Sequence, residues 1–127
     1  MKSNINFIYN EQPLEVVGDL TQTEFIATLI GNTIKTFGKL DVLVNNAGIY
    51  PTTNITQKDL MQVWDQVFAI DLRAVFELIH ESVSHLEKTN GTIIDISSIA
   101  GIRPVLCIKL IMNYQFIFNT TYYLSIH

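Results

Sequence analysis

Three groups of small polar residues in this 127-residue sequence have the types and positions needed to bind a ligand. They are Asp19, the run Asn45–Gly48 and the pair Ser97–Ser98, and each directly follows a short apolar, valine- or isoleucine-rich stretch. An aspartate accepts hydrogen bonds from an exocyclic amine, an alanine–glycine pair lets the backbone approach a ribose or a ring, and a serine donates to a carbonyl oxygen. A polar turn at the end of a strand is the simpler interpretation of the asparagines, so the surrounding elements must decide.

Strands and helices that alternate along the chain position these groups. We predict strands at Glu15–Gly18, Leu40–Val44 and Thr92–Ile96, a helix from Thr21 to Gly38, and a long helix from near Thr56 to Asn90–Gly91. Thr21 is the expected N-cap of the first helix, because Glu24 follows it in capping-box register. The strand Leu40–Val44 is mostly apolar and is expected to be buried on both faces. The order β-α-β-α-β predicts an α/β fold with parallel strands and right-handed crossovers.

The carboxyl ends of the predicted strands meet at one edge of such a sheet. In open parallel sheets a ligand crevice lies beyond this edge, and the residues that directly follow each strand line it. We therefore expect Asp19, Asn45–Gly48 and Ser97–Ser98 to face a single crevice.

Four stretches of the sequence carry a family resemblance: VVGDLT, FGKLDVLVNNAGI, VWDQVFAIDLRAVF and GTIIDISSIAG. In order and spacing, over residues 15 to about 104, they resemble the middle of a classical short-chain dehydrogenase/reductase, close to the β-ketoacyl-carrier-protein reductases. The resemblance implies a partial Rossmann fold, a parallel sheet with helices on both faces that lacks the first βαβ unit and the C-terminal part. It places a partial NAD(P)-binding domain at residues 1–106 and a divergent hydrophobic tail at residues 107–127.

The resemblance also implies an activity and roles for single residues. The activity is hydride transfer between NAD or NADP and a carbonyl or secondary alcohol. Ser98 matches the catalytic serine that holds the substrate oxygen, and Asp71 stands where the family has an asparagine of its proton relay. An ionised aspartate accepts hydrogen bonds but cannot donate them, so this relay is altered. The residues implied to bind the cofactor fall into three groups. Asp19 and Leu20 would lie against the adenine ring, Asn45, Asn46, Ala47 and Gly48 would line the adenosine side of the cofactor, and Ile96 would contact the cofactor as well.

Two motifs of the family are absent from the printed sequence. No Gly-rich turn, which holds the pyrophosphate at a helix N-terminus, precedes Asp19. The family's Tyr-x-x-x-Lys pair would fall at Ile111 and Gln115, and none of Tyr114, Tyr122 and Tyr123 is followed by a lysine at the fourth position. We therefore interpret the chain as a truncated, catalytically incomplete reductase from an incomplete or mis-spliced gene product. The alternative is a genuine short isoform with an added hydrophobic strand.

Composition and charge narrow the expected partners. The net charge is −4, and the eight Lys and Arg residues form no cluster, so we expect no nucleic-acid partner. No signal peptide and no run of ~18 uncharged apolar residues is present, so we expect a cytoplasmic chain without a membrane partner. The single Cys107 excludes an intrachain disulfide and a cysteine-based zinc site, and His80 and His85 lie too far apart on a helix for a zinc-protease motif. We expect no bound metal.

The remaining expected partners follow from the resemblance. They are a nicotinamide dinucleotide, a small carbonyl or alcohol substrate and, for a full-length form, further copies of the same chain. The alternative to an enzyme is a non-catalytic interaction or regulatory chain that pairs with a full-length paralogue through the long helix.

Overall fold

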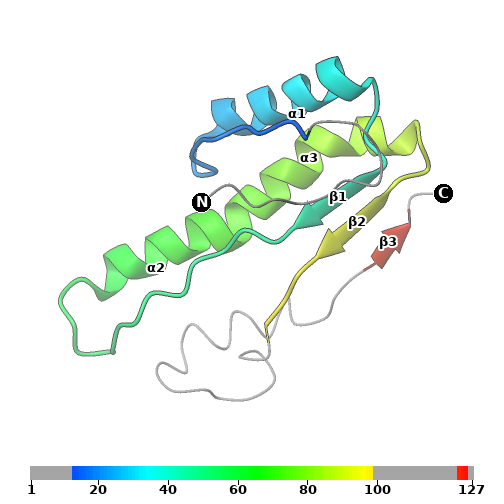
Figure 1. Ribbon diagram of the computed structural model, residues 1–127. Coiled ribbons are helices and arrows are strands. Elements are labelled where there is room, and N and C mark those ends of the chain that lie inside the picture. Colours follow the sequence, from blue (N-terminus) through cyan, green and yellow to red (C-terminus); the bar gives the residue numbers. More distant parts are fainter. Residues whose placement is uncertain (1–12, 99–122, 126–127) are drawn as a thin grey trace.

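The computed structural model describes residues 13–98 and 123–125, which form a small sheet covered by helices (Figure 1). In chain order the elements are helix α1 (Thr23–Phe37), strand β1 (Val42–Asn45), helix α2 (Leu60–Phe68), the π-helical segment η1 (Ala69–Arg73), helix α3 (Ala74–Glu87), strand β2 (Thr92–Asp95) and strand β3 (Tyr123–Ser125). Strands β1 and β2 are parallel, as predicted, and β3 pairs antiparallel with the other edge of β2. The rest of the tail lies outside the described residues.

One apolar layer between the helices and the sheet holds the described part together. Its buried members are Ile26, Ile30, Leu43, Ala74, Leu78, Leu86 and Ile93, contributed by α1, β1, α3 and β2. Both α1 and α3 lie on the same side of the sheet (Figure 1). On the opposite face of β1, Val42 and Val44 are 47% and 52% exposed. The expectation that this strand is buried on both faces is therefore wrong, because the described helices cover only one of them.

The segment before α1 differs from the prediction in two ways. No strand forms at Glu15–Gly18, and Val17 is 87% exposed. A strand needs a partner for its backbone groups, and no described strand lies beside this segment. The N-cap of α1 is Gln22 rather than Thr21. The Asp19 carboxylate accepts both the backbone N–H and the hydroxyl of Thr21, at 2.9 and 2.8 Å, so Thr21 belongs to a turn that precedes the helix.

The predicted long helix is a rod made of α2, η1 and α3 in direct succession (Figure 1). It begins at Leu60 and not near Thr56, because the Asn54 side chain holds Thr56 in a separate turn. The π-helical turn in the middle was not predicted, because one extra residue hardly changes a hydrophobic repeat read in steps of three and four. None of the described helices is long and apolar enough to cross a membrane.

The turn between α3 and β2 brings the two strands into register. The helix ends at Glu87, and the Thr89 hydroxyl donates to the Leu40 carbonyl at 2.7 Å, which joins the end of α3 to the segment that leads into β1. A Cβ atom built on Gly91 would lie 2.7 Å from the Asp41 carbonyl oxygen. Only glycine fits where these two backbone segments approach so closely.

Two glycines of the chain give a matched pair of substitutions. Gly91→Ala is expected to lower the free energy of unfolding by about 1–3 kcal/mol, because the new methyl group meets backbone that cannot move freely. Gly31→Ala is expected to raise it by about 0.5–1 kcal/mol, because Gly31 lies inside α1 with nothing within 4 Å of the built Cβ atom. Urea unfolding followed by circular dichroism measures both. Equal effects of the two substitutions would contradict the packing described for this turn.

Candidate functional site

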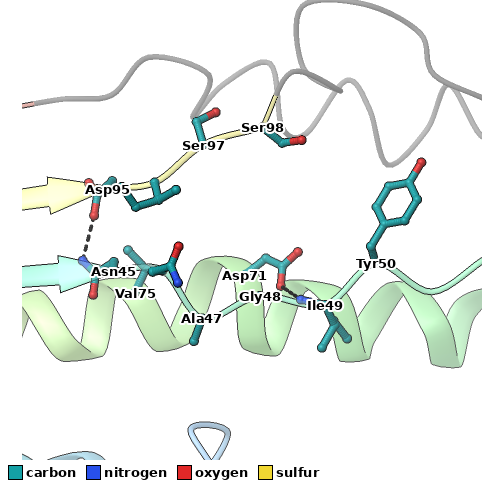
Figure 2. Close-up of a pocket in the computed structure, with 12 residues that line it drawn as sticks. Asn45, Ala47, Gly48, Ile49, Tyr50, Asp71, Val75, Asp95, Ser97 and Ser98 are labelled. Carbon is teal, nitrogen blue, oxygen red and sulfur yellow. Dashed lines mark hydrogen bonds between the residues drawn. The ribbon is translucent and has the colours of Figure 1, made fainter. Parts of the chain in front are cut away.

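A cleft of about 340 Å³ opens at the carboxyl ends of the parallel strands (Figure 2). It is lined by Asn45, Asn46, Ala47, Gly48, Ile49, Tyr50, Asp71, Val75, Asp95, Ile96, Ser97 and Ser98. The structure thus brings together all the predicted site residues except Asp19 and Leu20. They come from the ends of β1 and β2 and from the helical rod, so the cleft depends on the pairing of the two strands.

Asn45 links the two strand ends at one side of the cleft. Its backbone carbonyl accepts the Ile96 N–H at 2.9 Å, and its side-chain Nδ2 donates to Asp95 Oδ1 at 2.7 Å (Figure 2). Asn45 is only 6% exposed, and its Oδ1 has no hydrogen-bond partner among the described residues. A buried acceptor without a partner is energetically unfavourable. This oxygen is therefore suited to receive a hydroxyl or amine hydrogen from a ligand.

Asp71 closes the cleft from the helical rod. It lies in η1, and its Oδ1 accepts the Ile49 N–H at 2.9 Å, which ties the loop after β1 to the rod. Figure 2 shows the other carboxylate oxygen directed away from Ile49, toward the side on which Ser98 lies. Burial raises the pKa of the Asp71 carboxyl above its ordinary value of 3.8, and the hydrogen bond from Ile49 opposes the rise.

The described residues that line the cleft carry charge of one sign. Asp71 and Asp95 are the carboxylates among them, and none of these described residues is Lys, Arg or His. The nearest cation along the chain, Arg73, donates to Glu77 at 2.7 Å, and its side chain is 70% exposed. The cleft therefore suits a neutral or cationic group and disfavours a phosphate.

The two remaining predicted residues lie elsewhere. Leu20 lines a second, mainly apolar cavity of about 270 Å³, which shares Asn45, Asn46, Ala47 and Val75 with the cleft. Asp19 lines neither cavity. Its exposed carboxylate accepts the backbone N–H and the hydroxyl of Thr21, which lower its pKa. A role for Asp19 and Leu20 in holding an adenine ring stays a prediction.

Several lining residues were not chosen from the sequence. Asp95 had a visible signal, because it is the only charged residue in the predicted strand Thr92–Ile96. Ile49 and Tyr50 directly follow the run Asn45–Gly48, but nothing in their residue types marks them as site residues. Val75 enters the cleft from the rod by long-range packing. No group of three potential metal ligands occurs in the described part of the chain.

The sequence matches the family described as short chain dehydrogenase over residues 2–110. It is 37% identical over 86 residues to the L-fucose dehydrogenase of Mus musculus, which covers 68% of this chain and 32% of that protein. It is 38% identical over 84 residues to the trans-4-hydroxycyclohexanecarboxylate dehydrogenase of Sinomonas cyclohexanicum, which covers 66% of this chain and 32% of that protein. The chain thus spans about a third of the length of these curated relatives.

Solved structures agree with these sequence matches. The crystal structure of the KRED1-Pglu enzyme superimposes with a TM-score of 0.73 and 28% sequence identity, over 82% of this chain and 43% of that chain. The short chain dehydrogenase/reductase YIR035C of Saccharomyces cerevisiae gives a TM-score of 0.62 and 34% identity, over 67% of this chain and 34% of that chain. The chain therefore has the fold of part of such enzymes.

Asp71 gives the stability of the chain a predictable pH dependence. Because the folded chain keeps the Asp71 proton to a higher pH than the unfolded chain does, this group makes the free energy of unfolding fall from about pH 4 up through the raised pKa. Asp71→Asn removes this contribution and keeps an oxygen that accepts the Ile49 N–H. Urea unfolding between about pH 4 and pH 8 should show the variant gaining on the wild type as the pH rises.

A control for this measurement is Asp65→Asn, at an exposed position of α2 outside the cleft. It should change the free energy of unfolding by an amount that stays nearly constant over the same pH range. If Asp71→Asn behaves in this way as well, the Asp71 carboxylate is not held in the environment described.

Proposed function

Because the chain belongs to the short-chain dehydrogenase family, we propose that the protein in its full-length form transfers a hydride between NAD or NADP and a carbonyl or secondary alcohol. The observation that carries the proposal is the cleft itself, where Ser98 lines the same cavity as the run Asn45–Gly48. A hydroxyl that donates to a carbonyl oxygen and a backbone that admits a flat ring are the two requirements of such a reaction on the protein side.

The residues of the cleft have separate roles in the proposed reaction. The Ser98 hydroxyl donates to the substrate oxygen and fixes the position of the reacting carbon. Ala47 and Gly48 allow a ring and its ribose to lie against the backbone, and Asn45 Oδ1 accepts a hydrogen from the ribose or the carboxamide. When bound, the nicotinamide supplies the hydride donor or acceptor.

The residues of the cleft fit only part of a dinucleotide. The buried, unpartnered Asn45 Oδ1 suits a polar hydrogen of the ring or ribose. The diphosphate does not fit the lining that the structure describes, which contains two carboxylates and no cation. We propose that the diphosphate is held by residues outside the cleft.

Further expectations belong to this proposal. They are the division into a cofactor-binding part at residues 1–106 and a tail at residues 107–127, a cytoplasmic location, and assembly of the whole protein into a homo-oligomer. Nucleic acid and membranes have no role in it.

The 127-residue chain alone is expected to show no NAD(P)-dependent turnover, because the sequence holds no Tyr-x-x-x-Lys pair. The proposed function is tested in a chimera that contains the parts of the enzyme that this chain lacks. The 86-residue segment of mouse L-fucose dehydrogenase that this chain matches is replaced by the corresponding residues of this chain. The chimera should oxidise L-fucose with reduction of a nicotinamide cofactor, followed by absorbance.

Single substitutions in the chimera test the role of the cleft. Ser98→Ala should lower kcat about 100-fold or more, the loss typical of removing one hydrogen-bond donor to a developing oxyanion. Ser84→Ala, at an exposed position of α3, should leave kcat unchanged. A folded chimera without turnover would contradict the proposal and favour a non-catalytic interaction chain.

A further inference from the structure

We propose that Asp71 makes the cleft bind the oxidised, cationic form of a nicotinamide ring in preference to the reduced, neutral form. The inference rests on the proposed function and goes beyond it, because it names the charge state that this chain selects. It concerns Asp71, which stands where the resembled family has a neutral asparagine.

The position of the nicotinamide ring follows from the position of Ser98. Hydride transfer requires the reacting atoms to approach to about 3–3.5 Å. The carbon that gives or takes the hydride is bonded to the oxygen held by Ser98, so the ring must lie beside Ser98. Asp71 and Ser98 line one cavity of about 340 Å³. The ring and the Asp71 carboxylate therefore share this cavity.

The charge of the nicotinamide ring changes during the reaction. When an alcohol is oxidised, its carbinol carbon gives a hydride to C4 of the ring, and its hydroxyl gives a proton to solvent. The ring changes from a charge of +1 to neutral, and no other part of the cofactor changes charge. A fixed anion near the ring therefore stabilises the oxidised form and leaves the reduced form nearly unaffected.

No positive charge among the described lining residues cancels this effect. None of those residues is basic, and the Arg73 guanidinium is bonded to Glu77. Asp95, the other acid of the cleft, is bonded to the Asn45 amide, which is neutral. The Asp71 carboxylate uses Oδ1 for the Ile49 N–H, and the second oxygen is directed away from Ile49 toward the side of Ser98 (Figure 2). The charge that a ring meets from the described residues is therefore negative.

The substitution Asp71→Asn isolates this charge. An asparagine is nearly identical in shape, and its Oδ1 still accepts the Ile49 N–H. The variant therefore removes the negative charge and keeps the hydrogen bond that holds the loop. Asp65→Asn makes the same chemical change on an exposed part of α2 and serves as the control.

The test uses two small probes that need no phosphate site. They are 1-methylnicotinamide, a cation, and 1-methyl-1,4-dihydronicotinamide, its neutral reduced form. Binding to the 127-residue chain at about pH 8, far above the ordinary pKa of a carboxyl group, is measured from NMR shifts of the Gly48 and Ile49 amides. The cation is expected to bind about fivefold more tightly, the size of one ion pair at a partly exposed site. The ratio should fall to about one in Asp71→Asn and persist in Asp65→Asn.

The outcomes separate this inference from the proposed function. Equal binding of the two probes, or a preference that survives Asp71→Asn, overturns the inference and leaves the proposed function intact. If neither probe shifts these amides, the inference fails together with the placement of the ring in this cleft. The L-fucose-oxidising chimera gives a second measurement, the ratio of the Kd values for NADH and NAD⁺, which should fall in Asp71→Asn by about the same factor.

Discussion

The parallel pairing of β1 with β2 is the constraint on which the rest of the structure depends. The register places Asn45 opposite Asp95, and the chain leaves both strands at the same edge of the sheet. The Asn45–Asp95 hydrogen bond and the Ile96–Asn45 backbone bond fix this edge at the start of the cleft. Without this register the two polar strand ends would not line one cavity, and the chemistry of the site would be lost even if each element still formed.

A hydrogen bond between Asp71 and Ile49 holds a negative charge at the site. The Asp71–Ile49 hydrogen bond joins residues 22 positions apart and holds the loop after β1 against the helical rod. The same contact keeps a carboxylate partly buried in a cleft whose described lining contains no cation. Asp71 thus contributes both to the shape of the cleft and to its negative charge.

The sequence predicted best where a local signal or the general rule for parallel sheets decides the structure. Gly38 ends α1 with a left-handed backbone, which depends on the local sequence. The polar residues after β1 and β2 line one cleft because the two strands are parallel neighbours, as the rule for such sheets predicts. The prediction of a strand at Glu15–Gly18 was wrong, because strand formation depends on a partner strand, which a local pattern does not reveal. Thr21 had the correct type for an N-cap, but its hydrogen bonds to Asp19 hold it in the turn before the helix. The contact between Asp71 and Ile49 comes from long-range packing, so its position was predicted and its partner was not.

We propose that the cleft beyond β1 and β2 holds the nicotinamide half of a dinucleotide. A crystal structure of the L-fucose-oxidising chimera with NAD⁺ would show where the ring lies. Electron density for the ring is expected between Ser98 and the run Asn45–Gly48, with the diphosphate outside the cleft. Density for the ring in the apolar cavity lined by Leu20, or a cleft left empty while the cofactor binds elsewhere, would overturn this proposal.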